Sequence, residues 1–264
     1  MYYAGIDIGS TTTKTVIIDI KCNIVGKSLM KTGVNMKKTS EESLLLSLED
    51  SGIPSERLRK IIATGYGRNI AAYKDTTVPE IIAIAQGVSC CNNNGIKTIL
   101  DIGGQDTKVV KTGADGNVIK FMMNDMCAAG TGRFLENIAR ALEMKLEEMI
   151  EKGYNAVDII EIASACTVFA ESEIITCLSR GEKSESVFAG LHKSMVKRAI
   201  TLVQNVGFTQ PLFFTGGVTK NKCIRKMLEE KYGEVIIPDN PQLISAMGAA
   251  VIAMNKDKEG GMVS

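Results

Sequence analysis

One short motif occurs twice in this sequence, and that repetition limits the available folds more than any other feature. Residues 7–14 read DIGSTTTK and residues 101–108 read DIGGQDTK, with Asp, Ile, Gly, Thr and Lys in register. The register continues beyond the motif, because Asn23 matches Asn117. Each copy joins two apolar runs through a polar turn, which is typical of two strands and a tight connection. The repeat predicts a duplicated α/β fold with one copy in each half.

Hydrophobic periodicity gives a coarse order of helices and strands. In the first half, the predicted elements are strands at Tyr3–Ile8, Thr15–Ile20, Ile24–Leu29 and Lys60–Ala63, and a helix at Ser40–Asp50 with Ser40 as N-cap, Leu44, Leu45 and Leu48 as apolar residues and Ser51-Gly52 as its end. In the second half, they are helices at Thr131–Met144 and Ser186–Val206 (apolar stripe Leu191, Met195, Ala199 and Leu202), a strand at Pro211–Phe214, a helix from Asn221, a strand at Val235–Ile237, a helix from Pro241 and a frayed tail at Lys256–Ser264.

Composition narrows the class of protein. The chain has 264 residues, of which 45% are apolar, enough to build a sizeable core. Its 31 Lys and Arg nearly balance 30 Asp and Glu, so no net field recruits nucleic acid or an anionic membrane. The N-terminus does not resemble a signal peptide, and the seven scattered cysteines do not suggest a disulfide framework. We therefore expect a cytoplasmic protein with reduced thiols and with no nucleic-acid or membrane partner.

Each copy of the repeated motif has the composition of a phosphate-binding turn. Gly9 and Gly103 allow backbone N–H groups to approach phosphate oxygens closely. Asp7 and Asp101 end the preceding strands, where a carboxylate would orient water on a Mg²⁺ ion during phosphoryl transfer. The alternative for a single copy is a strand end and an ordinary tight turn, and the second copy in register favours phosphate binding. Further residues expected to bind nucleotide in these turns are Ser10, Thr11, Thr12, Thr13, Lys14 and Gly104.

Other residues near the turns are open to more than one interpretation. Gln105 is the candidate for positioning an attacking water, whereas Gln105 and Asp106 could instead cap the turn or face solvent. Competing nucleotide motifs are incomplete. Residues 26–28 resemble the end of a P-loop that lacks its first glycine, and the Gly-x-Gly segments at 65–67 and 130–132 lack the third glycine of a dinucleotide fingerprint.

Four segments in order resemble the nucleotide motifs of the actin, sugar-kinase and heat-shock-chaperone ATPases. The two repeated turns resemble their phosphate motifs, residues 213–218 (FFTGGV) the adenosine motif, and residues 246–250 (AMGAA) the second connecting helix. The resemblance implies a duplicated ribonuclease-H-like α/β fold with nucleotide in the cleft between two lobes. The first lobe would span 1–95, with a helix at 241–258 packing back on it, and the second 96–240. The resemblance also assigns Gly216, Gly217, Val218 and Gln242 to nucleotide binding.

Two cysteines precede helical patterns. The positive end of a helix dipole favours the thiolate form, which Cys127 and Cys166 would need as metal ligands. An iron-sulfur cluster usually needs four thiolates, so two cysteines supply half a set and a twofold dimer would complete it. The alternative is two buried cysteines that act as small apolar residues.

The residues around both cysteines resemble one family. The segments NDMCAAGTGRF at 124–134 and CTVFAESE at 166–173 are similar to the activator components of 2-hydroxyacyl-CoA dehydratases and to the related benzoyl-CoA reductase ATPase subunits. This resemblance implies a homodimer with one bridging 4Fe-4S cluster, held by Cys127 and Cys166 of each subunit. It further implies ATP hydrolysis that drives a low-potential electron to a partner iron-sulfur dehydratase or reductase, with ferredoxin or flavodoxin as the donor.

One segment departs from the family pattern. The family commonly has Thr or Ser before a Glu-Ile pair, and a His four residues after that Glu. This chain has Pro79 before Glu80 at the first of these positions and Ile84 at the second. The resemblance therefore does not identify the partner enzyme. The alternatives from other classes are a cluster-free small-molecule kinase, which would transfer phosphate without iron, and a cluster-free nucleotide-dependent binding module.

The remaining cysteines and the single histidine have simpler explanations. We expect Cys22, Cys90, Cys91, Cys177 and Cys223 to be structural, and His192 to pack or to face solvent without a metal partner. Arg68 and Arg133 could contact phosphate or a docking partner, although exposed arginines are usually only solvated.

Overall fold

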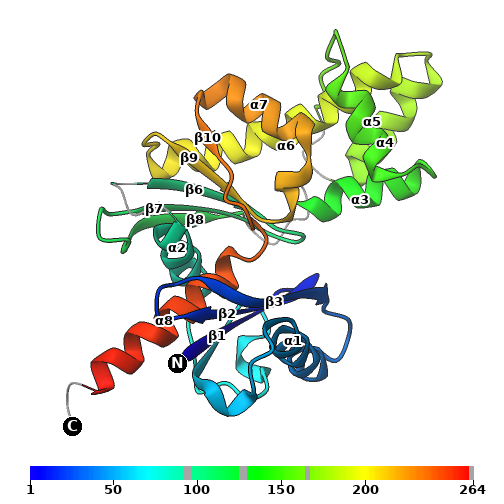
Figure 1. The fold of residues 1–264 in the computed structure, drawn as a ribbon. Helices are drawn as coiled ribbons and strands as arrows, with labels where there is room; N and C mark the ends of the chain where they lie inside the picture. The colour runs from blue at the N-terminus through cyan, green and yellow to red at the C-terminus, as the bar shows by residue number, and fades with distance from the viewer. Residues whose placement is uncertain (92–94, 96, 125–129, 164–166, 262–264) are drawn as a thin grey trace. The chain divides into compact units, whose positions relative to one another are not determined.

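The structure is a computed structural model that describes residues 1–91, 95, 97–124, 130–163 and 167–261 (Figure 1). The chain forms two compact units. The first comprises Met1–Ile96, Thr112–Ile119 and Pro238–Ser264, and the second comprises Lys97–Lys111 and Lys120–Ile237. No helix among the described residues combines the length and the apolar composition needed to cross a membrane.

The first unit is built on a five-stranded sheet with the order β3-β2-β1-β4-β5. Strands β1, β2 and β3 form an antiparallel meander, and β4 and β5 continue the sheet parallel to β1. Asp7, near the end of β1, pairs with Lys14 on one side and with Thr64 on the other, so the centre of the sheet positions it. The bounds are β1 Tyr2–Ile8, β2 Thr12–Asp19, β3 Ile24–Lys31, β4 Leu58–Thr64 and β5 Thr76–Thr77.

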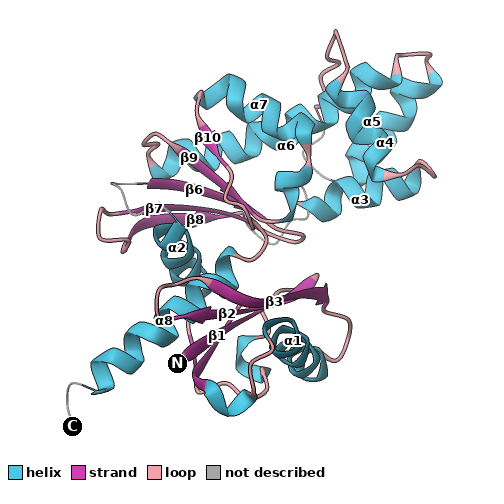
Figure 2. Cartoon of the chain, in the orientation of Figure 1, coloured by secondary structure: helices cyan, strands magenta, loops and turns pink. Residues whose placement is uncertain are grey.

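Helices cover both faces of this sheet (Figure 2). Since successive residues of a strand point to opposite faces, Ile6 and Ile8 of β1 join the core beneath α1, while Tyr3 joins the core beneath α8. Helix α8 lies very close to β1, because a Cβ at Gly5 would stand 1.9 Å from Ala246 O. The helices are α1 Met36–Ser51, α2 Glu80–Cys91 and α8 Ile244–Gly261, with short 3₁₀ turns at Ser55–Arg57 and Arg68–Ile70.

The first predicted helix is right in position but wrong in its start and its buried face. It begins at Met36 with Asn35 as N-cap, whose side chain accepts from Lys38 N at 3.1 Å. Ser40 lies inside the helix and is buried, and its hydroxyl accepts from Ala72 N. Leu45 is exposed. The buried face instead carries the hydroxyl residues Thr39, Ser40, Ser43 and Ser47 beside Leu44.

The last predicted helix also needs correction. Helix α8 begins at Ile244 rather than at Pro241, and it continues to Gly261. The predicted frayed tail from Lys256 is therefore helical as far as Gly261. Asp257 fixes this part of the helix, because its carboxylate accepts a hydrogen bond from Tyr3 Oη at 2.9 Å.

The second sheet belongs to the second unit except for the tip of its hairpin at Thr112–Ile119. Its strand order is β10-β9-β6-β7-β8, and like the first sheet it has a central strand followed by a hairpin. The turns of the two hairpins correspond: Cys22 has φ 64° and Gly116 has φ 77°. Asn23 and Asn117 each bond to the carboxylate of a preceding aspartate. The bounds are β6 Lys97–Ile102, β7 Thr107–Thr112, β8 Val118–Met123, β9 Leu212–Thr215 and β10 Val235–Ile236. The predicted duplication is thus confirmed down to its turns.

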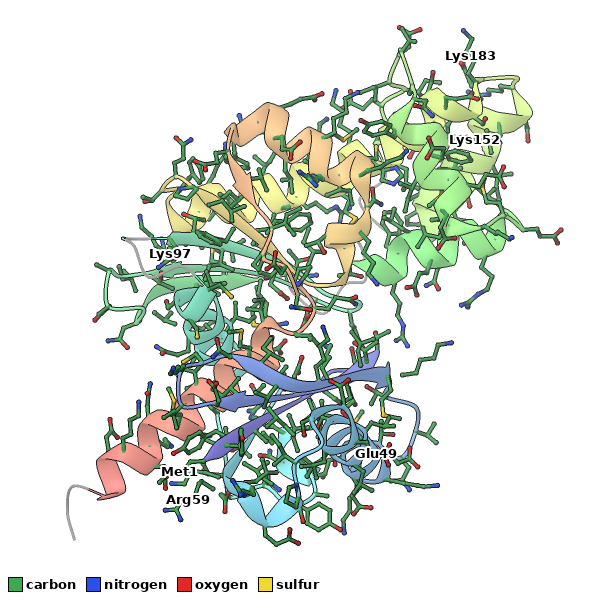
Figure 3. All side chains as sticks on the ribbon, in the orientation of Figure 1. Met1, Glu49, Arg59, Lys97, Lys152 and Lys183 are labelled. Carbon is green, nitrogen blue, oxygen red and sulfur yellow. The ribbon has the colours of Figure 1, made fainter. Side chains whose placement is uncertain are left out.

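Helices account for the rest of the second unit. Leu191, Met195 and Ala199 of the predicted stripe are buried, but Val203 completes it, because Leu202 is only half-buried. The fully buried Lys97 opens β6, and burial lowers its pKa (Figure 3). The bounds are α3 Gly132–Ala141, α4 Leu146–Tyr154, α5 Thr167–Ser179, α6 Ser184–Val206 and α7 Lys222–Tyr232, with a 3₁₀ turn at Gly217–Lys220.

Candidate nucleotide site

The first phosphate turn presents a buried carboxylate. Asp7 is 2% exposed, and its Oδ2 accepts from Lys14 Nζ at 2.9 Å. Its Oδ1 is buried with no hydrogen-bond partner among the described residues. Gly65, with φ 85°, leaves room for this oxygen, because a Cβ there would stand 2.3 Å from it. A buried carboxylate oxygen without a protein partner fits a water or a hydrated cation as its partner.

The turn itself closes through its own backbone. Gly9 N donates to Thr12 O at 3.1 Å, and a Cβ at Gly9 would stand 2.9 Å from that oxygen, so glycine is required here. The Thr11 hydroxyl is buried with no partner in the described structure. The Thr13 hydroxyl lies 3.0 Å from that of Thr32, which donates to Gly9 O. Thr32, the residue directly after β3, thus supports the turn, a role that no local sequence signal indicated.

The second turn repeats this geometry with different side-chain pairings. Gly103 N donates to Asp106 O at 3.0 Å, as Gly9 does to Thr12. Lys108, the counterpart of Lys14, pairs with Asp106 at 2.6 Å. Asp101 is 6% exposed and accepts from Thr215 Oγ1 at 2.7 Å. Gln105 is exposed, as a residue that positions water at the turn would need to be.

The adenosine motif lies beside the second turn within the same unit. Thr215 of β9 pairs with Asp101 of β6. Gly216, with φ 90°, continues across the end of β6, where a Cβ would stand 2.3 Å from Ile102 O. Val218 is buried against the core, and Gly217 opens the following 3₁₀ turn. The second unit therefore brings together one phosphate turn and the predicted adenosine residues. Gln242 is half-buried ahead of α8 in the first unit.

Helix α3 begins directly on the second turn. Gly132 N donates to Gly103 O at 2.9 Å, and Arg133 N donates to Gly104 O at 3.0 Å. Thr107 Oγ1 donates to Gly130 O at 2.8 Å. The sequence motif did not reveal these connections, because they join residues that are more than 20 positions apart.

The predicted cluster ligands, Cys127 and Cys166, lie outside the described residues. Among the described residues, no group of three or more His, Cys, Asp or Glu side chains is placed to hold a metal ion. Burial raises the pKa of Cys90 to about 12 and that of Cys223 to about 11. Partial desolvation and the nearby Asp239 carboxylate raise the pKa of Cys91, although its surface is exposed. These three thiols are therefore poor candidates for thiolate ligands at neutral pH.

His192 packs inside the second unit rather than facing solvent. It is fully buried, and its Nδ1 lies 2.7 Å from Phe188 O. Burial lowers its pKa to about 4, so the imidazole is neutral at pH 7. Ile84, at the position where the resembled family commonly has His, is also fully buried.

Comparison with known proteins agrees with this geometry. Residues 4–253 match the model of the BadF/BadG/BcrA/BcrD ATPase family. The chain is 40% identical to the 2-hydroxyisocaproyl-CoA dehydratase activator of Clostridioides difficile, over 98% of this chain and 97% of that protein. A structure described as the activator of the 2-hydroxyisocaproyl-CoA dehydratase from Clostridium difficile with bound ADPNP superposes with a TM-score of 0.91 at 38% identity, covering 100% of this chain and 98% of the other. A ROK family glucokinase from Streptomyces griseus shares the fold alone, with a TM-score of 0.58 at 12% identity over 97% of this chain and 100% of that one. The chain belongs to the BadF/BadG/BcrA/BcrD ATPase family and is an ATPase with the fold of actin, sugar kinases and heat-shock chaperones.

Proposed function

We propose that this ATPase is an electron-transfer activator. ATP hydrolysis would drive a low-potential electron from a homodimer-bridging 4Fe-4S cluster to a partner 2-hydroxyacyl-CoA dehydratase or iron-sulfur reductase. One observation carries the proposal: α3, the helix that follows Cys127 in the sequence, begins on the carbonyls of the second phosphate turn. The helix that begins on the predicted phosphate turn thus also follows a predicted cluster ligand closely in the sequence. The relative described as a 2-hydroxyisocaproyl-CoA dehydratase activator supports a role as an activator.

The phosphate turns supply the hydrolytic part of the proposal. Asp7 and Asp101 would hold Mg²⁺ through water, and the buried Asp7 Oδ1 without a partner among the described residues fits that role. Gly9 and Gly103 would bring backbone N–H groups to the phosphates of ATP or ADP. Gln105 would orient the attacking water, and its exposed side chain is free to reach a bound nucleotide.

The cysteines supply the redox part. Cys127 and Cys166 of each subunit would hold the cluster, which when bound supplies one-electron redox chemistry. The chemistry of the ligand atoms favours Cys127 and Cys166 over Cys90 and Cys223, because burial keeps the latter two thiols protonated. Ferredoxin or flavodoxin would reduce the protein in the cytoplasm. Because Pro79 and Ile84 depart from the common family pattern, the partner is proposed only as a dehydratase or a related reductase.

The test is iron and sulfide analysis of protein purified without oxygen. We expect about four iron atoms per dimer in the wild type and a large loss in Cys127→Ser and in Cys166→Ser, with ATP hydrolysis retained. Cys91→Ser, at an exposed cysteine outside the proposed ligand set, is the matched control and should keep its iron. Full iron content in both ligand variants, or an iron-free monomeric wild type, would contradict the proposal.

A further inference from the structure

The second phosphate turn and α3 are joined by two particular peptide units. Gly103 O and Gly104 O accept from the first N–H groups of α3, at Gly132 and Arg133. In a trans peptide, the carbonyl and the following N–H point in opposite directions. The N–H groups of Gly104 and Gln105 therefore point away from α3. The same two peptide units can bind phosphate at one end and hold a helix at the other.

Thr107 provides a second connection close by. Its Oγ1 donates to Gly130 O at 2.8 Å, and its backbone N donates to Asn124 Oδ1 at 2.7 Å. Its carbonyl accepts from Asn124 N at 3.0 Å. Thr107 is 2% exposed, so these bonds are shielded from water. In the sequence, Asn124 and Gly130 stand on either side of Cys127, and Thr107 contacts both of them.

The first repeat shows the counterpart of this threonine in a related arrangement. Thr13 is the counterpart of Thr107, and its hydroxyl contacts Thr32, whose own backbone N donates to Thr11 O. Thr32 follows β3 and leads into α1, and its carbonyl accepts from Thr39 Oγ1 of that helix at 2.7 Å. In both repeats, the threonine hydroxyl thus bonds to the segment that leads into the next helix. The partner is the Thr32 side chain in the first repeat and the Gly130 carbonyl in the second.

We propose that Thr107 is a positioning residue that makes α3 follow the state of the second phosphate turn. This inference rests on the proposed function and adds the residue that links its two parts. Phosphate bound to the N–H groups of Gly104 and Gln105 polarises the peptide units whose carbonyls hold α3. Thr107 ties Gly130 to the same turn, so the start of α3 moves with it.

The test compares nucleotide states in iron-free protein. Iodoacetamide alkylation of Cys127, followed by peptide mass spectrometry, should proceed at different rates with ADP and with ADPNP. We expect Thr107→Val, which removes only the hydroxyl, to reduce that difference by about fivefold, the size expected for one hydrogen bond. Thr107→Ser keeps the donor and should restore it. Thr112→Val is the matched control on the same strand, because the Thr112 hydroxyl is buried with no partner among the described residues.

A Thr107→Val variant that keeps the full nucleotide difference overturns the inference. A second measurement needs no variant: hydrogen exchange at the amides of Gly132 and Arg133 should differ between ADP and ADPNP in the wild type, and equal exchange also overturns it. Iron analysis separates this outcome from the proposed function. Loss of nucleotide coupling in a protein that never binds iron would support the Thr107 connection and refute the cluster.

Discussion

Replacing Gly248 with alanine tests why the segment 246–250 resembles a connecting-helix motif. In the structure, this glycine is the point where α8 crosses α2. A Cβ at Gly248 would stand 1.7 Å from Ala83 O and 2.7 Å from Gly87 N, whereas an ordinary contact needs at least 3.4 Å. Both near atoms belong to backbone, so no side chain can rotate away. Helix α8 would have to separate from α2, and Ala249, Ala250 and Ala253 would lose packing with it.

Two effects of opposite sign decide the size of the change. Alanine is a better helix former than glycine by about 1 kcal/mol, which alone would stabilise the protein. Overpacking costs about 3 kcal/mol at such a backbone contact, so the net loss is about 2 kcal/mol. The thermal unfolding midpoint should fall by about 4–8 °C. Lys256→Ala, at an exposed position of the same helix, should change it little. A higher midpoint in Gly248→Ala would refute the reasoning.

Three further predictions concern the second unit and the turns. The folded-state pKa of His192, about 4, lies below its unfolded value, so the stability that neutral His192 contributes is lost as pH falls from about 6.5 to about 4. In urea titrations at several pH values, His192→Gln should remove about 3 kcal/mol of this pH dependence. An unchanged pH dependence in the variant would argue against this role. Thr215→Val should lower the ATPase rate about tenfold because it releases the Asp101 carboxylate, while Thr215→Ser should stay near the wild-type rate. A valine variant that releases phosphate from ATP as fast as the wild type would exclude this role. Gly65→Ala should lower kcat about a hundredfold by displacing the Asp7 carboxylate, and a normal kcat would show that the oxygen has room to move.

The duplicated core could be predicted from the sequence because strand, turn and strand are local signals that occur twice in register. The hairpin turns at Cys22 and Gly116 show how far that register holds. The helix at 36–51 was harder, since its buried face carries hydroxyl groups rather than apolar side chains. Ser43 Oγ lies 2.8 Å from Thr15 Oγ1 and 2.7 Å from Ser28 Oγ, so hydroxyl groups of β2 and β3 serve as hydrogen-bond partners for this buried face.

The candidate site likewise has residues whose positions the sequence predicts and residues whose contacts it does not. Asp7, Gly9, Asp101 and Gly103 stand in a motif with fixed spacing, and the structure places each at a strand end or turn as predicted. Thr107, however, acts through a carbonyl 23 positions away. Such a contact depends on where α3 starts in space, which no local pattern specifies.

The placement of α8 has a consequence for synthesis on the ribosome. The first sheet buries one face against a helix that begins only at Ile244, whereas the second unit ends at Ile237. Until α8 has been synthesised, one face of the first sheet lacks this helix, and β1 exposes apolar side chains such as Tyr3. A chain truncated before Ile244 would therefore leave that strand open to chaperones and proteases.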